Sequence, residues 1–155
     1  MTRIIRYQGA IIRDHHILLI KHTEHAGRSY WVIPGGGIEP DETEEECVQR
    51  EMQEETCLHV QVQHLLLDEP GILGGVYQRR KTYLCHILHG EPQPGYEPEA
   101  EASSVYGITE VGWFDLQQPT TWNDQIVADS ITYPQLQQIQ AALGYVVAEK
   151  IVKSD

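Results

Sequence analysis

The segment 35–58, GGGIEPDETEEECVQREMQEETCL, constrains the fold of this chain more than any other stretch. It begins as a glycine-rich turn and continues as a helix rich in glutamate. Thr43 is a favourable N-cap residue, and Glu46 three positions later completes a capping box that satisfies two backbone N–H groups. Glu44, Glu45 and Glu46 fall in the first turn, where the positive end of the helix dipole favours carboxylates. Helix formation alone explains these three acids.

Three further glutamates, Glu51, Glu54 and Glu55, lie in the last turns of the same helix, where the dipole disfavours negative charge. Their spacing places the three carboxylates on one helix face, about 5–6 Å apart. Mutual repulsion costs about 1 kcal/mol at most, whereas a bound divalent cation returns about 2.7 kcal/mol at a hundred times its dissociation constant. Such oxygen ligands suit a hard cation such as Mg²⁺. Arg50, four positions from both Glu46 and Glu54, can hold one carboxylate while the others bind metal.

The segment resembles the Nudix box, Gly-x5-Glu-x7-Arg-Glu-U-x-Glu-Glu-x-Gly-U, in which U is a bulky aliphatic residue. The residues that match at the required spacing are Gly36, Glu42, Arg50, Glu51, Met52, Glu54, Glu55 and Leu58. Cys57 stands where the family has glycine. That glycine usually ends the helix in a left-handed conformation, which costs a residue with a Cβ about 1–2 kcal/mol. The departure affects the end of the helix and removes no carboxylate.

The resemblance implies an α/β Nudix fold, with a mixed β-sheet sandwiched between α-helices, formed by residues 1–155 as a single domain. It also implies a divalent-metal-dependent pyrophosphohydrolase that cleaves a phosphoanhydride bond in a nucleoside diphosphate linked to another group. Mg²⁺ is the expected ion, and Mn²⁺ is expected to substitute for it. Bound Mg²⁺ neutralises the diphosphate and lowers the pKa of the attacking water.

The resemblance also assigns roles to residues of the segment. The catalytic residues are Glu51, Glu54 and Arg50. The metal ligands are Glu51, Glu54, Glu55 and the carbonyl of Gly35. The residues that shape the turn and orient the helix are Gly36, Glu42 and Arg50. The resemblance leaves open which carboxylate acts as the general base.

Length, charge and cysteine content restrict the class of protein. A chain of 155 residues is long enough to bury a core as one domain. The net charge of −12 argues against binding to duplex nucleic acid, which needs a basic face. Cys47, Cys57 and Cys85 lack CxxC spacing, which favours reduced thiols in a cytoplasmic protein. No apolar run of about 18 residues and no signal peptide is recognisable. We therefore expect a small-molecule substrate, no membrane partner, and a monomer or homodimer.

Local patterns predict the order of the elements. Strands are expected at 4–13, 17–21, 30–33, 58–67, 76–88 and 110–116. Loops are expected at 22–29, 68–75 and 89–109. Residues 14–16 form the turn of a hairpin. A second helix is expected over 134–143, with Pro134 in its first position and Gly144 as its stop. Residues after about 145 have no assigned role.

Candidate substrate contacts lie on the expected strand 76–88, which carries the basic run Arg79, Arg80 and Lys81. Neighbouring strand residues face opposite sides, so either Arg80 or the pair Arg79 and Lys81 shares a face with the box. Arg79, Arg80 and Tyr83 are the candidates for substrate binding. A charged strand edge that preserves solubility is the alternative interpretation.

The long loop 89–109 carries Glu97, Glu99 and Glu101. The family resemblance implies that a glutamate from such a loop adds a metal ligand or the general base, with Glu99 and Glu101 as candidates. Specificity signatures are not recognisable, because Tyr77 and Pro70 do not lie at the distances from the box that such signatures require. The sequence therefore leaves nucleoside triphosphates, ADP-ribose, nucleotide sugars and dinucleoside polyphosphates open as substrates.

Three other functions remain alternatives. A catalytically silent Nudix domain would act as a nucleotide-binding sensor, although such domains usually lack box carboxylates and all three are present here. An isoprenoid-diphosphate isomerase on the same fold requires catalytic Cys and Glu placements that cannot be identified. An acidic scaffold would bind no metal. Metal titration separates the scaffold from the others, and turnover separates a hydrolase from a sensor.

Overall fold

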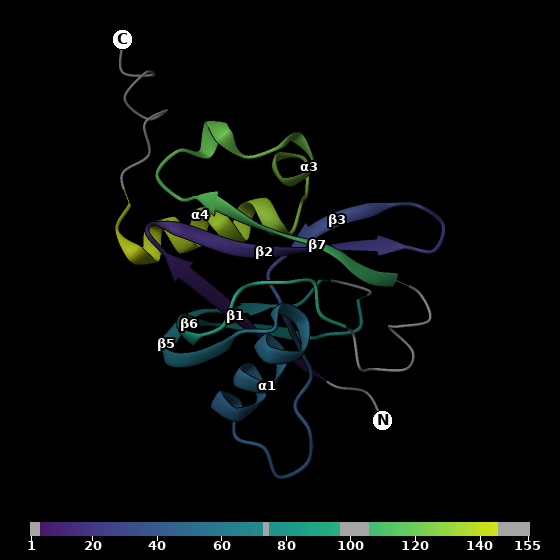
Figure 1. Cartoon of the computed structure of the whole chain (residues 1–155), viewed down its shortest axis with the longest axis vertical. Helices are drawn as coiled ribbons and strands as arrows, with labels where there is room; N and C mark the ends of the chain where they lie inside the picture. Colours follow the sequence, from purple (N-terminus) through teal and green to yellow (C-terminus); the bar gives the residue numbers. More distant parts are fainter. Residues whose placement is uncertain (1–3, 73–74, 97–105, 146–155) are drawn as a thin grey trace.

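Strand β1 (Ile5–Arg13) runs through the middle of a mixed sheet (Figure 1). The computed structural model describes residues 4–72, 75–96 and 106–145. Within these residues the sheet has seven strands in the order β3-β2-β1-β6-β5, with β4 paired to β1 and β7 paired to β2. The other strands are β2 (His16–Glu24), β3 (Ser29–Val32), β4 (Gly35–Gly36), β5 (His59–Pro70), β6 (Arg79–His89) and β7 (Tyr106–Asp115). The sheet is mixed because β1 is parallel to β6 and antiparallel to β2.

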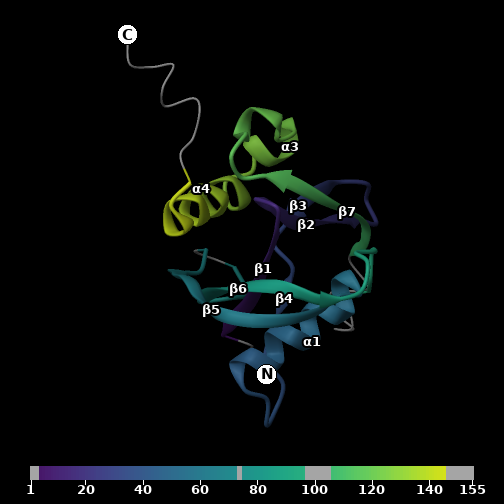
Figure 2. The ribbon, with the colours of Figure 1, turned by 60° about the vertical axis from the view of Figure 1, so that its left-hand side comes forward.

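Helices cover the two faces of this sheet (Figure 2). Helix α1 (Glu44–Thr56) contacts β1, β4 and β5, whereas α4 (Thr132–Leu143) packs on β5 and α3 (Asp124–Val127) on β3. A 3₁₀ turn, η1 (Pro119–Thr121), follows β7. These layers confirm the expected α/β architecture of a mixed sheet between helices. No helix in the described ranges combines the length and apolar character needed to cross a bilayer.

Alternation along β1 divides the core into two buried clusters. Tyr7 and Ile11 belong to the cluster under α1, together with Val48 and Met52 of that helix. Ala10 belongs to the cluster on the α4 side, with Leu136 of α4. Side chains one position apart on a strand point to opposite faces, so a single strand supplies both clusters. The sheet is therefore buried on both faces, and α1 is held against it by its apolar side.

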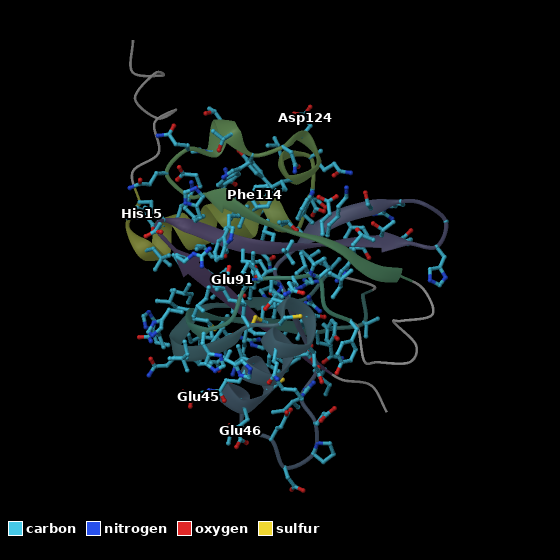
Figure 3. The ribbon with its side chains drawn as sticks, viewed as in Figure 1. His15, Glu45, Glu46, Glu91, Phe114 and Asp124 are labelled. Carbon is cyan, nitrogen blue, oxygen red and sulfur yellow. The ribbon has the colours of Figure 1, made fainter. Side chains whose placement is uncertain are left out.

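Both ends of α1 are defined by specific residues. Thr43 Oγ1 accepts a hydrogen bond from the backbone N–H of Glu46, whose carboxylate accepts one from the N–H of Thr43, which confirms the predicted capping box. Glu45 and Glu46 are exposed and project from the outer end of the helix (Figure 3). Cys57 ends the helix with φ 65° and ψ 19°. This exposed cysteine therefore adopts the left-handed conformation that the family glycine usually adopts.

Several strands begin or end at other residues than the local patterns predict. β2 continues to Glu24 instead of ending at residue 21, because its last residues pair with both β3 and β7. β5 continues to Pro70 through residues expected in a loop, since Pro70 pairs with Arg79. β7 begins at Tyr106, earlier than the expected residue 110, and β6 begins at Arg79, later than the expected residue 76. These boundaries are set by pairing with neighbouring strands, which a local sequence pattern does not specify.

The C-terminal part of the chain departs from the prediction in smaller ways. The predicted stop of α4 is confirmed, because Gly144 caps the helix with φ 75°. The predicted start is wrong, since the helix begins at Thr132 and Pro134 is its third residue. The elements β4, η1 and α3 were not predicted, because each is at most four residues long and shows no periodic pattern.

Candidate active site

The glycine turn before α1 lies directly against the last turns of that helix. β4 (Gly35–Gly36) pairs with β1 at Gln8 and Tyr7, and the backbone N–H of Gly35 donates a hydrogen bond of 2.8 Å to Oε1 of Glu55. A Cβ on Gly35 would collide with the backbone carbonyl of Tyr7, and one on Gly36 would fall onto the carboxylate of Glu51. Only glycine fits at these two positions, because Gly35 lies against the backbone of β1 and Gly36 against the carboxylate of Glu51.

Arg50 is the centre of the ionic network. Its Nε lies 2.6 Å from Oε2 of Glu42, and its Nη1 lies 3.0 Å from both Oε2 of Glu51 and Oε1 of Glu54. Its Nη2 donates to the carbonyl of Gly37 at 3.0 Å. The guanidinium therefore joins the turn to the helix.

Of the two glutamates that helical spacing places within reach of Arg50, Glu54 binds it and Glu46 does not. Oε1 of Glu46 instead accepts the hydrogen bond from the Thr43 backbone N–H at 2.9 Å, so capping of the helix occupies this carboxylate. Glu42 lies outside the helix and takes the place of Glu46 beside Arg50. A contact across eight positions depends on how the turn folds back, which helical spacing does not predict.

The carboxylates of the site differ in burial. Glu51 and Glu55 are fully buried, whereas 18% of the Glu54 side chain is exposed. Burial by itself would lower the pKa of Arg50, but its hydrogen bond to Glu42 and the charges of the surrounding glutamates raise it. Arg50 is therefore a permanent cation that forms ion pairs with Glu42, Glu51 and Glu54.

The residues at this site fit the chemistry of a divalent cation in donor type and charge. Every side-chain donor is a carboxylate oxygen, the ligand that hard cations prefer, and the last turn of α1 contains no basic residue. Among the described residues, no three His, Cys, Asp or Glu side chains form a preassembled metal cluster. Nη1 of Arg50 donates to one carboxylate oxygen of Glu51 and to one of Glu54.

Residues 93–96, in the first half of the expected loop 89–109, are hydrogen-bonded to the end of α1. The backbone N–H groups of Gln93, Gly95 and Tyr96 donate to the carbonyls of the last helical residues, Thr56, Glu55 and Glu54, at 2.9–3.0 Å. A Cβ on Gly95 would collide with the carbonyl of Glu54, so glycine is required here. The signal in the sequence was the turn-forming run Pro94-Gly95. Glu97, Glu99 and Glu101, which follow in the sequence, lie outside the described residues.

The candidate substrate contacts of β6 are divided between the two faces of the sheet. Arg79 forms an ion pair with Asp68, with Nε 2.5 Å from Oδ1. The hydroxyl of Tyr83 donates to Glu44 of α1, and burial, followed by that hydrogen bond, raises the pKa of Tyr83. Arg80 points to the opposite face. Contact of Arg79, Arg80 and Tyr83 with substrate stays a prediction.

Comparison with known proteins agrees with this geometry. The family model of the NUDIX domain matches residues 5–133. A protein of Caenorhabditis elegans named putative nudix hydrolase 1 is 32% identical over 131 residues, which cover 84% of this chain and 34% of that protein. The human 8-oxo-dGDP phosphatase NUDT18 is 33% identical over 92 residues, which cover 57% of this chain and 26% of that protein. The chain therefore spans only about a quarter to a third of the length of these two relatives.

A solved structure supports the same relationship. The MutT NUDIX hydrolase from Burkholderia pseudomallei superimposes with a TM-score of 0.65 at 27% sequence identity, covering 87% of this chain and 96% of that one. The fold, the glycine turn, the arginine-centred carboxylates and the family model agree. This chain belongs to the Nudix family.

Proposed function

We propose that this protein is a hydrolase that cleaves a phosphoanhydride bond in a nucleoside diphosphate linked to another group, with a divalent cation as cofactor. The observation that carries the proposal is the placement of Glu51, Glu54 and Glu55. All three carboxylates lie at one end of α1, two are fully buried, and the glycine turn closes over them. Family membership supports the same chemistry, since the relatives that match are named as hydrolases and phosphatases.

The chain supplies positioning and proton transfer. Gly35 holds Glu55 through its backbone N–H, and Arg50 holds Glu51 and Glu54. Glu54 is the member of the three that solvent reaches, so it is well placed to accept a proton from an attacking water. Glu51 remains the alternative base.

We propose Mg²⁺ as the cofactor, with Mn²⁺ as a substitute. The residues that would hold it are Glu51, Glu54, Glu55 and the carbonyl of Gly35, with a contribution from Glu99 or Glu101. When bound, such an ion neutralises the diphosphate and lowers the pKa of the attacking water. Two features support Mg²⁺ as the ion. All the donor atoms are oxygens, and the single positive charge of Arg50 is smaller than the summed negative charge of the carboxylates that it contacts.

The proposal is tested by a hydrolysis panel with Mg²⁺ and with Mn²⁺, in which products are identified by mass. The panel contains nucleoside di- and triphosphates, ADP-ribose, nucleotide sugars, dinucleoside polyphosphates and isoprenoid diphosphates. We expect metal-dependent cleavage at an anhydride bond, with a rate reduced roughly a hundredfold in a Glu54→Gln preparation purified in the same way. Metal binding without any turnover would favour the sensor, rearrangement of an isoprenoid diphosphate would favour the isomerase, and failure to bind metal would refute both the hydrolase and the metal site.

A further inference from the structure

Two arginines lie side by side on the face of the sheet opposite α1. Arg6 of β1 and Arg80 of β6 are paired residues of the parallel ladder, so their side chains leave the sheet on the same face. The next ladder pair on the same face is Gln8 and Thr82, and its contacts identify the face as the one that α4 covers. Oε1 of Gln8 accepts from Thr82 Oγ1 at 3.1 Å and from Nε2 of Gln135, on α4, at 3.2 Å. The arginine pair thus belongs to the α4 side of the sheet.

Arg80 differs from the basic residues on either side of it in the chain. Arg79 forms an ion pair with Asp68, and Lys81 lies 3.3 Å from a carboxylate oxygen of Glu44. The side chain of Arg80, in contrast, makes no hydrogen bond or ion pair with any residue in the part of the chain that the structure describes, although it is half-buried. Glu69 is paired with it across the ladder.

The carboxylate of Glu69 is engaged elsewhere. Its Oε1 accepts a hydrogen bond of 2.7 Å from Nε2 of Gln135. Burial first, and then the charge of Arg6, lower the pKa of Arg80, with Glu69 opposing this shift. Two guanidinium groups on neighbouring strands are therefore held together against their mutual repulsion, at a half-buried position where charge repulsion is less screened than in water.

The arginine pair adjoins the glycine turn of the box. Nη2 of Arg6 donates to the carbonyl of Ile33 at 2.9 Å, and Nε2 of Gln8 donates to the same carbonyl at 3.3 Å. Ile33 precedes Gly35 by two residues, and Gly35 contacts Glu55 on the other side. The turn therefore lies between the carboxylates of α1 and the arginine pair.

We propose that Arg6 and Arg80 form an anion subsite that binds a substrate phosphate other than the two joined by the scissile bond. A guanidinium fork matches the geometry of a phosphate and gives charge-assisted hydrogen bonds. The subsite selects substrates with at least three phosphates, such as nucleoside triphosphates and dinucleoside polyphosphates, over diphosphates linked to a neutral sugar. The inference rests on the proposed function for its substrate, although the anion subsite itself is testable without turnover.

The kinetic test compares a nucleoside triphosphate with a nucleoside-diphosphate sugar of the same base. For Arg80→Gln we expect the KM for the triphosphate to rise about tenfold, the effect of one charge-assisted hydrogen bond, with kcat and the KM for the sugar nucleotide unchanged. Arg80→Lys retains the charge without the fork and should give an intermediate KM. Arg13→Gln, which removes an exposed charge from the far end of β1, is the matched control. Equal effects of Arg80→Gln on both substrates, or no effect, would overturn the subsite.

A binding test is independent of catalysis. The full chain, free of metal, is titrated with inorganic phosphate while the arginine Nε–Hε resonances are followed by NMR. We expect a saturable shift of two resonances, one of which is missing in Arg80→Gln, and a weaker affinity for phosphate in that variant. No saturable shift in the wild-type protein, or the same affinity in the variant, would refute the subsite. Absence of hydrolysis across the panel would refute the proposed function. It would not refute the anion subsite, which the phosphate titration tests separately.

Discussion

The backbone N–H of Gly35 and Oε1 of Glu55 form a buried hydrogen bond of 2.8 Å across twenty positions of the sequence. The bond ties the glycine turn before α1 to the last turn of that helix. A buried carboxylate must be hydrogen-bonded or paired, because an isolated buried charge is very costly. The turn thus supports the carboxylate group that the proposed function requires, and changes on either side of this contact should affect activity.

Replacement of Glu54 by glutamine should lower kcat by roughly a hundredfold, because it removes a proposed metal ligand and proton acceptor. The amide keeps the size of the side chain, and Glu54 is partly exposed, so the fold should persist. Turnover in Mg²⁺ and the circular dichroism spectrum check these two expectations. Glu45→Gln, on the exposed outer end of the same helix, serves as the control. Near-wild-type activity of Glu54→Gln would remove Glu54 from the site.

Replacement of Gly36 by alanine should displace the carboxylate of Glu51, because the new Cβ would fall on it. We expect at least about a tenfold loss of kcat/KM, the scale of effect for a misplaced catalytic group, and a lower melting temperature. The control is Gly107→Ala, since a Cβ there meets no atom within 4 Å. If both variants behaved like the wild type, Gly36 would not be in contact with Glu51 in solution.

Cys57→Gly should be neutral or stabilising, because residue 57 is left-handed with φ 65° and its side chain is exposed. Glycine removes a conformational cost of about 1–2 kcal/mol, part of which is offset by the greater entropy of glycine in the unfolded chain. Cys57→Ala keeps the Cβ and should leave the melting temperature unchanged. A clear fall in melting temperature for the glycine variant would indicate a right-handed, packed residue 57.

His22 should make the protein less stable as the pH falls below 6.5. Burial, and then the charge of Arg6, lower the pKa of His22 from 6.5 to about 3, so the folded state keeps it neutral. Between these values the unfolded state binds the extra proton, and the free energy of unfolding falls by up to about 1.4 kcal/mol per pH unit. The ring of Tyr30 packs edge-on against the imidazole of His22, with 5.5 Å between the ring centroids.

The measurement is the free energy of denaturant unfolding at a series of pH values from about 7 down to about 4.5. His22→Asn should show a shallower dependence on pH than the wild type, whatever its absolute stability. His25→Asn, in an exposed turn, should keep the wild-type dependence. An unchanged slope in His22→Asn would show that the carboxylates alone cause the acid sensitivity.

Local features of the chain were predicted well where their causes are local. The capping of α1 by Thr43 and Glu46 depends on residues within one turn, and the structure shows it as expected. The glycine stop of α4 is another such case. Helical spacing also predicted the contact between Arg50 and Glu54, whereas Glu42 reaches Arg50 only after the turn has folded back on the helix. The short elements β4 and α3 were missed because they carry no periodic pattern.

The family and the carboxylates of the box can be recognised from residue spacing, because positions three and four apart on a helix share a face. The order of the main elements follows from local patterns of apolar and turn-forming residues. The burial of Glu51 and Glu55, the support of Glu55 by Gly35 and the position of Arg80 beside Arg6 appear only in the folded chain. These relationships depend on strand register and on the packing of α1 against the sheet. Both are set by contacts between residues far apart in the chain, which no local pattern specifies.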